Sequence, residues 1–263
     1  MTRALLATLL LAAALSDASA QTLAARIAAA GDGPVLFHFA PRPGVCGDGR
    51  GTIRIGRSMW MGNGFAGGID ARECEPGPVT VRATLSGGAV DRIESWVGRV
   101  REREGRVLGE VPAAEAARWL LGVAARSRGS VPEKAITPAM LADAPPDWRA
   151  LLAIARGDDR GRSARTGAAF WLSRLAAAAT LGHPGDIAAA DREENETDEQ
   201  DLKGHAVFVL SQRPRHEGIP ALIHVAQTNP DAGVRAKAMF WLGQTGDSRV
   251  LDLFERILSE ARR

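Results

Sequence analysis

The chain has 263 residues, of which 45% are hydrophobic and 24% charged, a composition that excludes extensive disorder and suffices for one large or two ordinary domains. Its 33 Lys and Arg residues nearly balance its 31 Asp and Glu residues, so the formal net charge is only +2. Because a nucleic-acid-binding protein normally carries a large basic excess on one face, this balance argues against nucleic acid as a partner.

Residues 1–20 have the three parts of a secretory signal peptide. A positively charged start (Met1–Arg3) is followed by an apolar run too short to span a bilayer (Ala4–Leu15) and by the small-x-small sequence Ala18–Ala20. The alternative is a buried N-terminal helix. Cleavage after Ala20 leaves Gln21 first, with no cysteine there to carry a lipid, and no later run reaches about 18 apolar residues. We therefore expect a periplasmic or secreted protein without a stable membrane anchor.

Export determines how the two cysteines, Cys46 and Cys74, are interpreted. In an oxidising compartment, two cysteines separated by a glycine-rich segment favour one disulfide, which stabilises the fold by about 3 to 4 kcal/mol in the chain-entropy model. The alternative is a catalytic site built from His38, Cys46 and Asp48, in which Cys46 is the nucleophile and His38 its base. Such a site would belong to a hydrolase or lyase.

Residues 21–108 have the patterns of strands and turns, and we expect a small antiparallel β-rich domain held by the disulfide. Pro34–Ala40 is a short aromatic and β-branched run, and Val79–Leu85 alternates apolar with polar residues before the turn Ser86–Gly88, which is typical of a hairpin. Pro41–Gly51 is glycine-rich like a phosphate-binding loop, but it lacks the Lys-Ser or Lys-Thr pair and the helix that such a loop needs. We interpret it as a turn region that carries one end of the disulfide.

Residues 109–263 have the hydrophobic period of helices, and no convincing strand pattern appears among them. Pro112 suits a first helical turn, and apolar residues recur on one face of the helix from Ala116 to Val123. Thr137 before Pro138 indicates a further helix start. The fold class that we expect is therefore α+β, with the β-rich part first.

Three segments of the helical part can be laid over one another, at residues 165–174, 203–212 and 235–244. Each begins with a long cation and has alanine fourth, phenylalanine sixth and leucine eighth. Their spacing of 38 and 32 residues is in the range of helical solenoid repeats. The residues that we expect in the repeat core are Ala168, Phe170, Leu172, Ala206, Phe208, Leu210, Ala238, Phe240, Trp241 and Leu242.

Asn229–Asp247, with the sequence NPDAGVRAKAMFWLGQTGD, resembles the unit of HEAT-repeat proteins. In that family Pro-Asp opens a turn, Val-Arg starts the second helix, and alanine, leucine and glycine mark its packing face. The segment Arg42–Gly51 combined with such repeats also resembles exported bacterial proteins. The resemblance covers residues 217–260 best, extends to parts of 112–216, and does not cover the β-rich part. It implies an α-solenoid over residues 109–263, in which each second helix packs against its own partner and the next repeat.

The resemblance also implies an inter-repeat ladder at Arg235, Arg165 and Lys203, with Asp231 and Glu199 as acidic partners. Gly161 departs from this pattern in the first copy. A second feature is a stripe of polar positions on the repeat helices that we do not expect to be buried by packing. We expect this stripe either to bind a partner or to be a solvated face. Its members are Lys237, Gln244, His205, Gln212 and Arg174.

No catalytic constellation accompanies the repeats, so we expect an exported, non-enzymatic protein–protein interaction module with no metal and no cofactor. The alternative is the hydrolase or lyase with His38, Cys46 and Asp48, for which the solenoid would be a docking arm. A third possibility is a small-molecule sensor that uses the concave face. We interpret the acidic run Asp191–Asp201 as an inter-repeat loop. His216-Glu217 is a single His-Glu pair and does not suffice for the iron site of HEAT-repeat hydroxylases.

Overall fold

The computed structural model describes residues 21–56, 59–61, 74–101, 103–189 and 202–261, so the expected signal peptide and the acidic run Asp191–Asp201 lie outside the described residues. The protein is α+β. A mixed β-sheet with the Cys46–Cys74 disulfide comes first, and helices follow. One continuous hydrophobic core runs through both parts. Within the described residues, no helix is long and apolar enough to cross a membrane.

Among its described residues, the β-rich part contains one helix and two sheets. The main sheet has the order β6-β5-β1-β7, and a small antiparallel sheet has the order β2-β3-β4. The bounds are α2 (Leu23–Ala30), β1 (Gly33–Phe39), β2 (Val45–Gly47), β3 (Ile53–Ile55), β4 (Met59–Met61), β5 (Val79–Ser86), β6 (Ala89–Val97) and β7 (Arg106–Glu110).

The expected hairpin is confirmed as β5 and β6. Val79, Val81, Ala83 and Leu85 are buried, and the residues between them are half-buried. The turn needs Gly87 and Gly88 because both have positive φ, 57° and 74°, which suits a two-residue hairpin turn.

The expectation of a purely antiparallel domain is wrong for one strand, because β7 pairs parallel with β1. After β6, at one edge of the sheet, the chain crosses to the other edge, where β7 runs in the same direction as β1. The helix α2, which Thr22 caps at its N-terminus, was not expected either.

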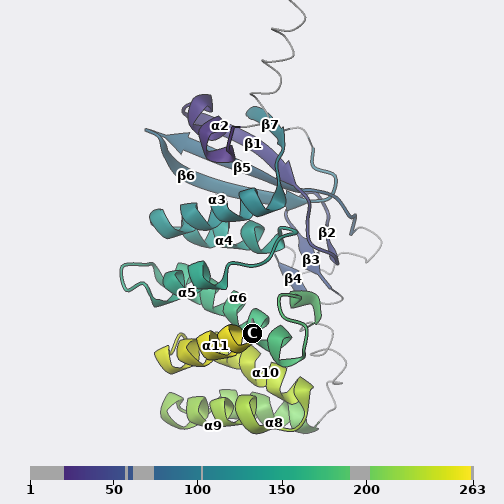
Figure 1. The fold of residues 1–263 in the computed structure, drawn as a ribbon, viewed down its shortest axis with the longest axis vertical. Helices are drawn as coiled ribbons and strands as arrows, with labels where there is room; N and C mark the ends of the chain where they lie inside the picture. The colour runs from purple at the N-terminus through teal and green to yellow at the C-terminus, as the bar shows by residue number, and fades with distance from the viewer. Residues whose placement is uncertain (1–20, 57–58, 62–73, 102, 190–201, 262–263) are drawn as a thin grey trace, which may run out of the picture.

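The helices lie in successive layers along the long axis of the molecule, beginning under the main sheet (Figure 1). Phe37 of β1 meets Trp119 edge-on, with ring centroids 5.6 Å apart, and this contact joins the sheet to the first helix layer. The bounds are α3 (Ala113–Arg126), α4 (Val131–Leu141), α5 (Trp148–Arg156), α6 (Arg162–Thr180), α8 (Leu202–Ser211), α9 (Arg215–Thr228), α10 (Ala232–Gly243) and α11 (Ser248–Glu260).

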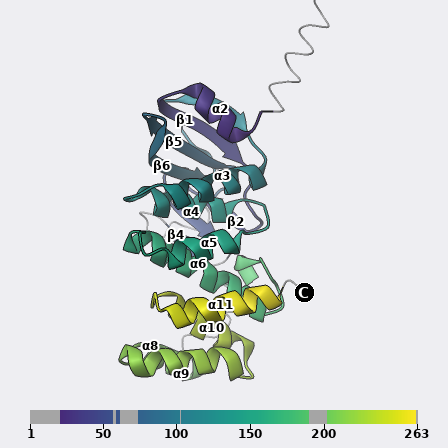
Figure 2. The same ribbon diagram turned by 60° about the vertical axis from the view of Figure 1, so that its left-hand side comes forward.

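The layers do not follow chain order. Helix α10 packs against α6, so the first and third copies of the ten-residue pattern are neighbours, and the second copy, in α8, lies beyond them. Gly243 permits this approach, because a Cβ there would lie 2.5 Å from Ser173 Oγ. In Figure 1 the yellow helices α10 and α11 lie between the α5–α6 layer and the α8–α9 layer, and Figure 2 shows the same order.

The helices α10 and α11 each begin at a capping aspartate. The side chains of Asp231 and Asp247 accept backbone N–H groups at the starts of α10 and α11, and Gly246 before the second cap has φ 66°. The helix start expected at Pro138 is wrong, because Pro138 lies inside α4. The helix begins earlier, with Pro132 in its first turn.

The β-rich and helical parts are joined at a short backbone pairing and at Arg42. Pro41 forms an isolated antiparallel bridge with Ala142, next to a hydrogen bond of 2.8 Å from the Arg42 N–H to the Leu141 carbonyl. The Arg42 side chain is only 8% exposed. Burial lowers the pKa of Arg42 below its ordinary value, and the charges of Asp143 and Asp186 oppose this shift.

The Arg42 guanidinium donates to carbonyl oxygens from two different connections. Nη1 bonds Gly185 O at 3.0 Å, after α6, and Nη2 bonds Ala142 O at 3.2 Å and Ala144 O at 3.4 Å, between α4 and α5. A planar, permanently charged group with forked donors suits such a site, since it can serve several carbonyls at once.

Arg42→Ala is expected to lower the free energy of unfolding by about 2 to 4 kcal/mol, because it leaves buried carbonyls without donors. Arg42→Lys is expected to recover only part of this loss, since an ammonium cannot reproduce the fork. Urea unfolding measures both variants. A loss below about 0.5 kcal/mol for Arg42→Ala would show that the joint does not depend on this side chain.

Leu242→Ala is expected to destabilise the protein by about 2 to 5 kcal/mol, as large-to-small changes in cores do. Leu242 is 0% exposed, whereas Val209 on α8 is 48% exposed, so Val209→Ala is the matched control and should change stability by less than about 0.5 kcal/mol. Equal effects in thermal or chemical unfolding would contradict the assignment of α10 to the core of the helix stack.

Candidate partner-binding surface

Four of the five expected stripe residues lie at the surface or reach it. His205, Gln212 and Gln244 are exposed. Lys237 is half-buried and crosses onto α8, where a Cβ on Gly204 would lie 2.6 Å from its Nζ.

The fifth stripe residue, Arg174, was placed wrongly. It is 3% exposed, because α6 is packed by α4, α5, α10 and α11 and has little free surface at this position. The expected stripe therefore reduces to the part formed by α8 and α10.

The expected repeat core holds for α6 and α10. Ala168, Leu172, Ala238 and Leu242 are all 0% exposed. Phe170 and Trp241 pack partly against the core. Phe240 is half-buried.

The repeat core does not hold for α8. Ala206 is exposed, Phe208 is 40% exposed and Leu210 is half-buried. The physical reason is the position of α8 in the layer farthest from the main sheet (Figure 1). There α8 packs against α9 and α10. Positions of the ten-residue pattern that pack into the core in α6 and α10 are therefore exposed in α8.

The aromatic side chains of the two helices form a connected row. The ring of Trp241 lies 5.4 Å from that of Phe208 and 5.3 Å from that of Phe240, between centroids, and His205 lies 6.1 Å from Phe208. Trp241 Nε1 is buried and has no hydrogen-bond partner among the described residues. The row thus runs from the packed seam of α10 to the open face of α8.

A pocket of about 260 Å³ lies next to this row, between the end of α8, the start of α9 and the end of α10. Gln212 and Gln244 both line it, with Trp241 as one wall. Arg213 at its edge is held by Glu217 through two hydrogen bonds of 2.9 and 2.6 Å. The pocket therefore offers amide groups beside an apolar wall, which suits a polar side chain or main-chain group of a partner.

Apolar side chains continue the surface outward from the pocket. Val209 is 48% exposed and Leu202 is 81% exposed, and both lie on α8. We call the surface of His205, Phe208, Val209, Gln212 and Gln244 the α8 surface. It combines apolar contact area with hydrogen-bonding amides, as the centres of protein interfaces do.

The expected ladder is present at one place. Lys203 Nζ lies 3.1 Å from Asp231 Oδ2 and connects α8 to the cap of α10. Hydrogen bonds from the Val234 N–H and the Lys203 side chain lower the pKa of Asp231 below its ordinary value. Arg165 reaches Asp158 only at 4.0 Å.

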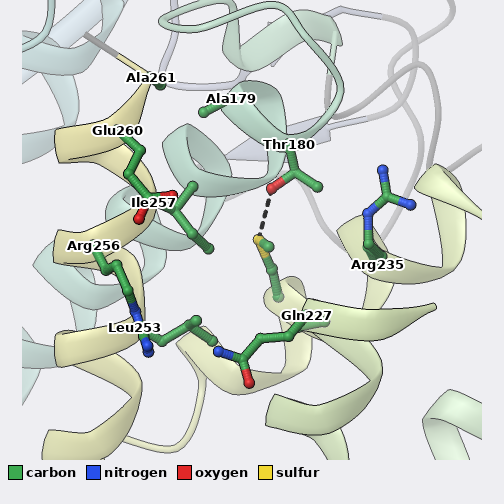
Figure 3. A pocket seen from close by; sticks show the side chains of 11 residues that line it. Ala179, Thr180, Gln227, Arg235, Leu253, Arg256, Ile257, Glu260 and Ala261 are labelled. Carbon is green, nitrogen blue, oxygen red and sulfur yellow. Dashed lines mark hydrogen bonds between the residues drawn. The ribbon is translucent and has the colours of Figure 1, made fainter. Parts of the chain in front are cut away.

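A second cavity, of about 520 Å³, lies among α6, α9, α10 and α11 (Figure 3). The hydroxyl of Thr180 contacts the sulfur of Met239 at 3.7 Å inside it. Arg235 on its wall donates from Nη1 to the carbonyls of Asn229 and Pro230, at 2.8 and 3.0 Å. Its guanidinium therefore holds the turn before α10.

The alternative catalytic set is not assembled. Cys46 forms a disulfide with Cys74, with a Cα–Cα distance of 5.3 Å, so its sulfur is not a thiolate nucleophile. His38 lies on β1 of the main sheet, whereas Cys46 lies on β2 of the small sheet.

Asp48 has a structural task in the glycine-rich segment. Its Oδ1 accepts the N–H groups of Arg50, Gly51 and Thr52 at 2.8, 3.0 and 2.9 Å. Burial raises the pKa of Asp48, but these backbone hydrogen bonds outweigh burial and leave the pKa below its ordinary value. The interpretation of Pro41–Gly51 as a turn region holds from Asp48 onward, but Val45–Gly47 in its middle form strand β2. Gly47 of β2 packs closely, since a Cβ there would lie 2.6 Å from the Val97 carbonyl oxygen.

Among the described residues, no group of three or more His, Cys, Asp or Glu side chains is arranged to hold a metal ion. His216 Nε2 lies 3.5 Å from Glu217 Oε1, a contact between sequence neighbours at the start of α9.

Comparisons with protein-family models, with curated proteins and with solved structures found no match to this chain.

Thiol titration is expected to find no free thiol before reduction and two after it, because both cysteines of the chain are joined in the disulfide. Cys46→Ser is the control and should expose the single thiol of Cys74 without reduction. A thiol that titrates in the unreduced wild-type protein would reopen the thiolate mechanism.

Proposed function

We propose that this protein is an exported, non-enzymatic interaction module built on HEAT-like helical repeats, and that it binds a protein partner through the α8 surface. The observation that carries the proposal is the exposure of Phe208 and Val209 at the open end of the helix stack. Terminal repeats of a soluble stack normally have a polar outer face, because no further repeat covers them. An apolar terminal helix therefore points to a partner that covers it.

Three further observations support the HEAT-like part of the proposal. The pattern of residues 165–174 and 235–244 is buried as a packing face in both helices. The Pro-Asp turn before α10 provides the capping carboxylate, Asp231. The helices α9 and α10, which we assign to one unit, pack against each other. The unit organisation over residues 109–263 is the finer statement that we propose, with a β-rich part over 21–108.

Export is supported by the disulfide, because such bonds form and persist in oxidising compartments. A periplasmic or secreted location is thus part of the proposal. The hypothesis of a hydrolase or lyase has less support. Its proposed nucleophile, Cys46, is held in the disulfide, and the carboxylate of Asp48 holds a turn.

The test is a pull-down from the native exported fraction with the full chain, expressed for export. Val209→Glu is expected to reduce recovery of the partner at least about tenfold, since a charge in the centre of an apolar contact costs about 1.4 kcal/mol or more. Val107→Glu is the matched control, because Val107 is also apolar and exposed, at 69%, but lies on β7. It should leave recovery unchanged.

Equal recovery with both variants would place the interface elsewhere. Recovery of no partner by crosslinking, together with turnover of a substrate, would overturn the proposal as a whole.

A further inference from the structure

We propose that the β-rich part contains a binding site for a small organic dianion, in a cavity of about 500 Å³ between β6, the small sheet and α4. This cavity is separate from the α8 surface, and the inference does not rest on the proposed function. A volume of this size is within the range of small-molecule sites in proteins.

Positive charge is in excess around the cavity. Arg50, Arg103 and Lys134 line it, with Glu133 and Glu94 as the acidic residues. The charge of Glu94 is balanced, because Arg82 donates to its Oε2 from Nε and Nη2, at 2.8 and 2.5 Å. Among the described residues that line the cavity, three cations then face one carboxylate.

None of these three cations forms an ion pair with a described residue, and neither does Glu133. Like charges that converge on one cavity repel one another, and the repulsion is stronger next to low-dielectric walls. An anion with two negative charges would remove this repulsion.

The guanidinium of Arg103 is already oriented. Its central carbon lies 4.5 Å from the ring centroid of Trp96, which is itself only 6% exposed. Stacking on an indole fixes the plane of a guanidinium and leaves its edge free for hydrogen bonds. Arg103 Nε is buried and has no hydrogen-bond partner among the described residues. A donor held in this way lacks only an acceptor, and carboxylate or phosphate oxygens match the guanidinium fork.

Arg50 is positioned by the turn that Asp48 holds. The Asp48 carboxylate accepts the Arg50 and Gly51 N–H groups, at 2.8 and 3.0 Å, and so fixes the backbone from which the Arg50 side chain extends. Lys134 comes from the first half of α4. The three cations thus come from three different segments of the chain and meet only through the fold.

The remaining wall determines the class of ligand. Ile53, Met61 and Ile93 are apolar and line the same cavity. A bare inorganic ion would leave this wall without contact, whereas an organic body would cover it. The shared chemistry that we infer is therefore a small organic molecule with two negative charges on carboxylate or phosphate oxygens.

The test is isothermal titration and thermal unfolding of the full chain at constant ionic strength with three probes, succinate, phenyl phosphate and inorganic phosphate. We expect a rise in melting temperature and measurable heat with succinate or phenyl phosphate, and a weaker effect with inorganic phosphate. The comparison of the first two distinguishes a dicarboxylate from a phosphate ester.

Lys134→Ala and Arg50→Ala are expected to weaken binding by at least about tenfold each, because each removes one charge from the cavity. Both side chains are exposed residues of the rim, so the variants should fold. Arg118→Ala removes an exposed cation of α3 outside the cavity and is the matched control, which should bind as the wild type does. Absence of heat and of a thermal shift with all three probes at millimolar concentration would overturn the proposal. Equal affinity of the Lys134, Arg50 and Arg118 variants would overturn it as well.

Discussion

The relation between the two parts of the molecule depends on Arg42. One buried guanidinium serves carbonyls from the α4–α5 connection and from the segment after α6, while its own backbone pairs with the end of α4. A buried charge is costly unless it is hydrogen-bonded, and these carbonyls offset that cost. One side chain from the glycine-rich segment therefore links the first and second helix layers to the β-rich part, in addition to the hydrophobic core that runs through both parts. The disulfide holds the same segment at Cys46.

The features that could be predicted from the sequence are those that few or neighbouring residues determine. The β5–β6 hairpin depends on residues close in sequence and the Cys46–Cys74 pairing on the small number of cysteines, and the structure contains both. The parallel entry of β7 and the insertion of α10 next to α6 depend on contacts between distant segments, for which a single sequence holds no direct signal.

The candidate site shows the same division. A helical pattern identifies which side of a helix is apolar but not whether a neighbour covers it. The residue pattern is shared by α6, α8 and α10, yet Leu172 and Leu242 are fully buried while Phe208 is exposed, because only α8 lies at an end. Arg174 is the opposite case, a polar residue buried by four surrounding helices. The three cations near Trp96 were not found from the sequence, since they come from separate segments.

The insertion of α10 has a consequence for how the molecule assembles. In a stack that follows the chain, each layer can form as soon as its residues are present, and an incomplete chain has only a shorter stack. Here the surface of α6 is covered by residues about 65 positions later, so α8 and α9 have no base to pack on until α10 arrives. If the chain crosses a membrane starting from its N-terminus, the middle layer of the helix stack, which α10 and α11 form, is therefore the last to be completed. Such a chain would expose the apolar side of α6 throughout the passage.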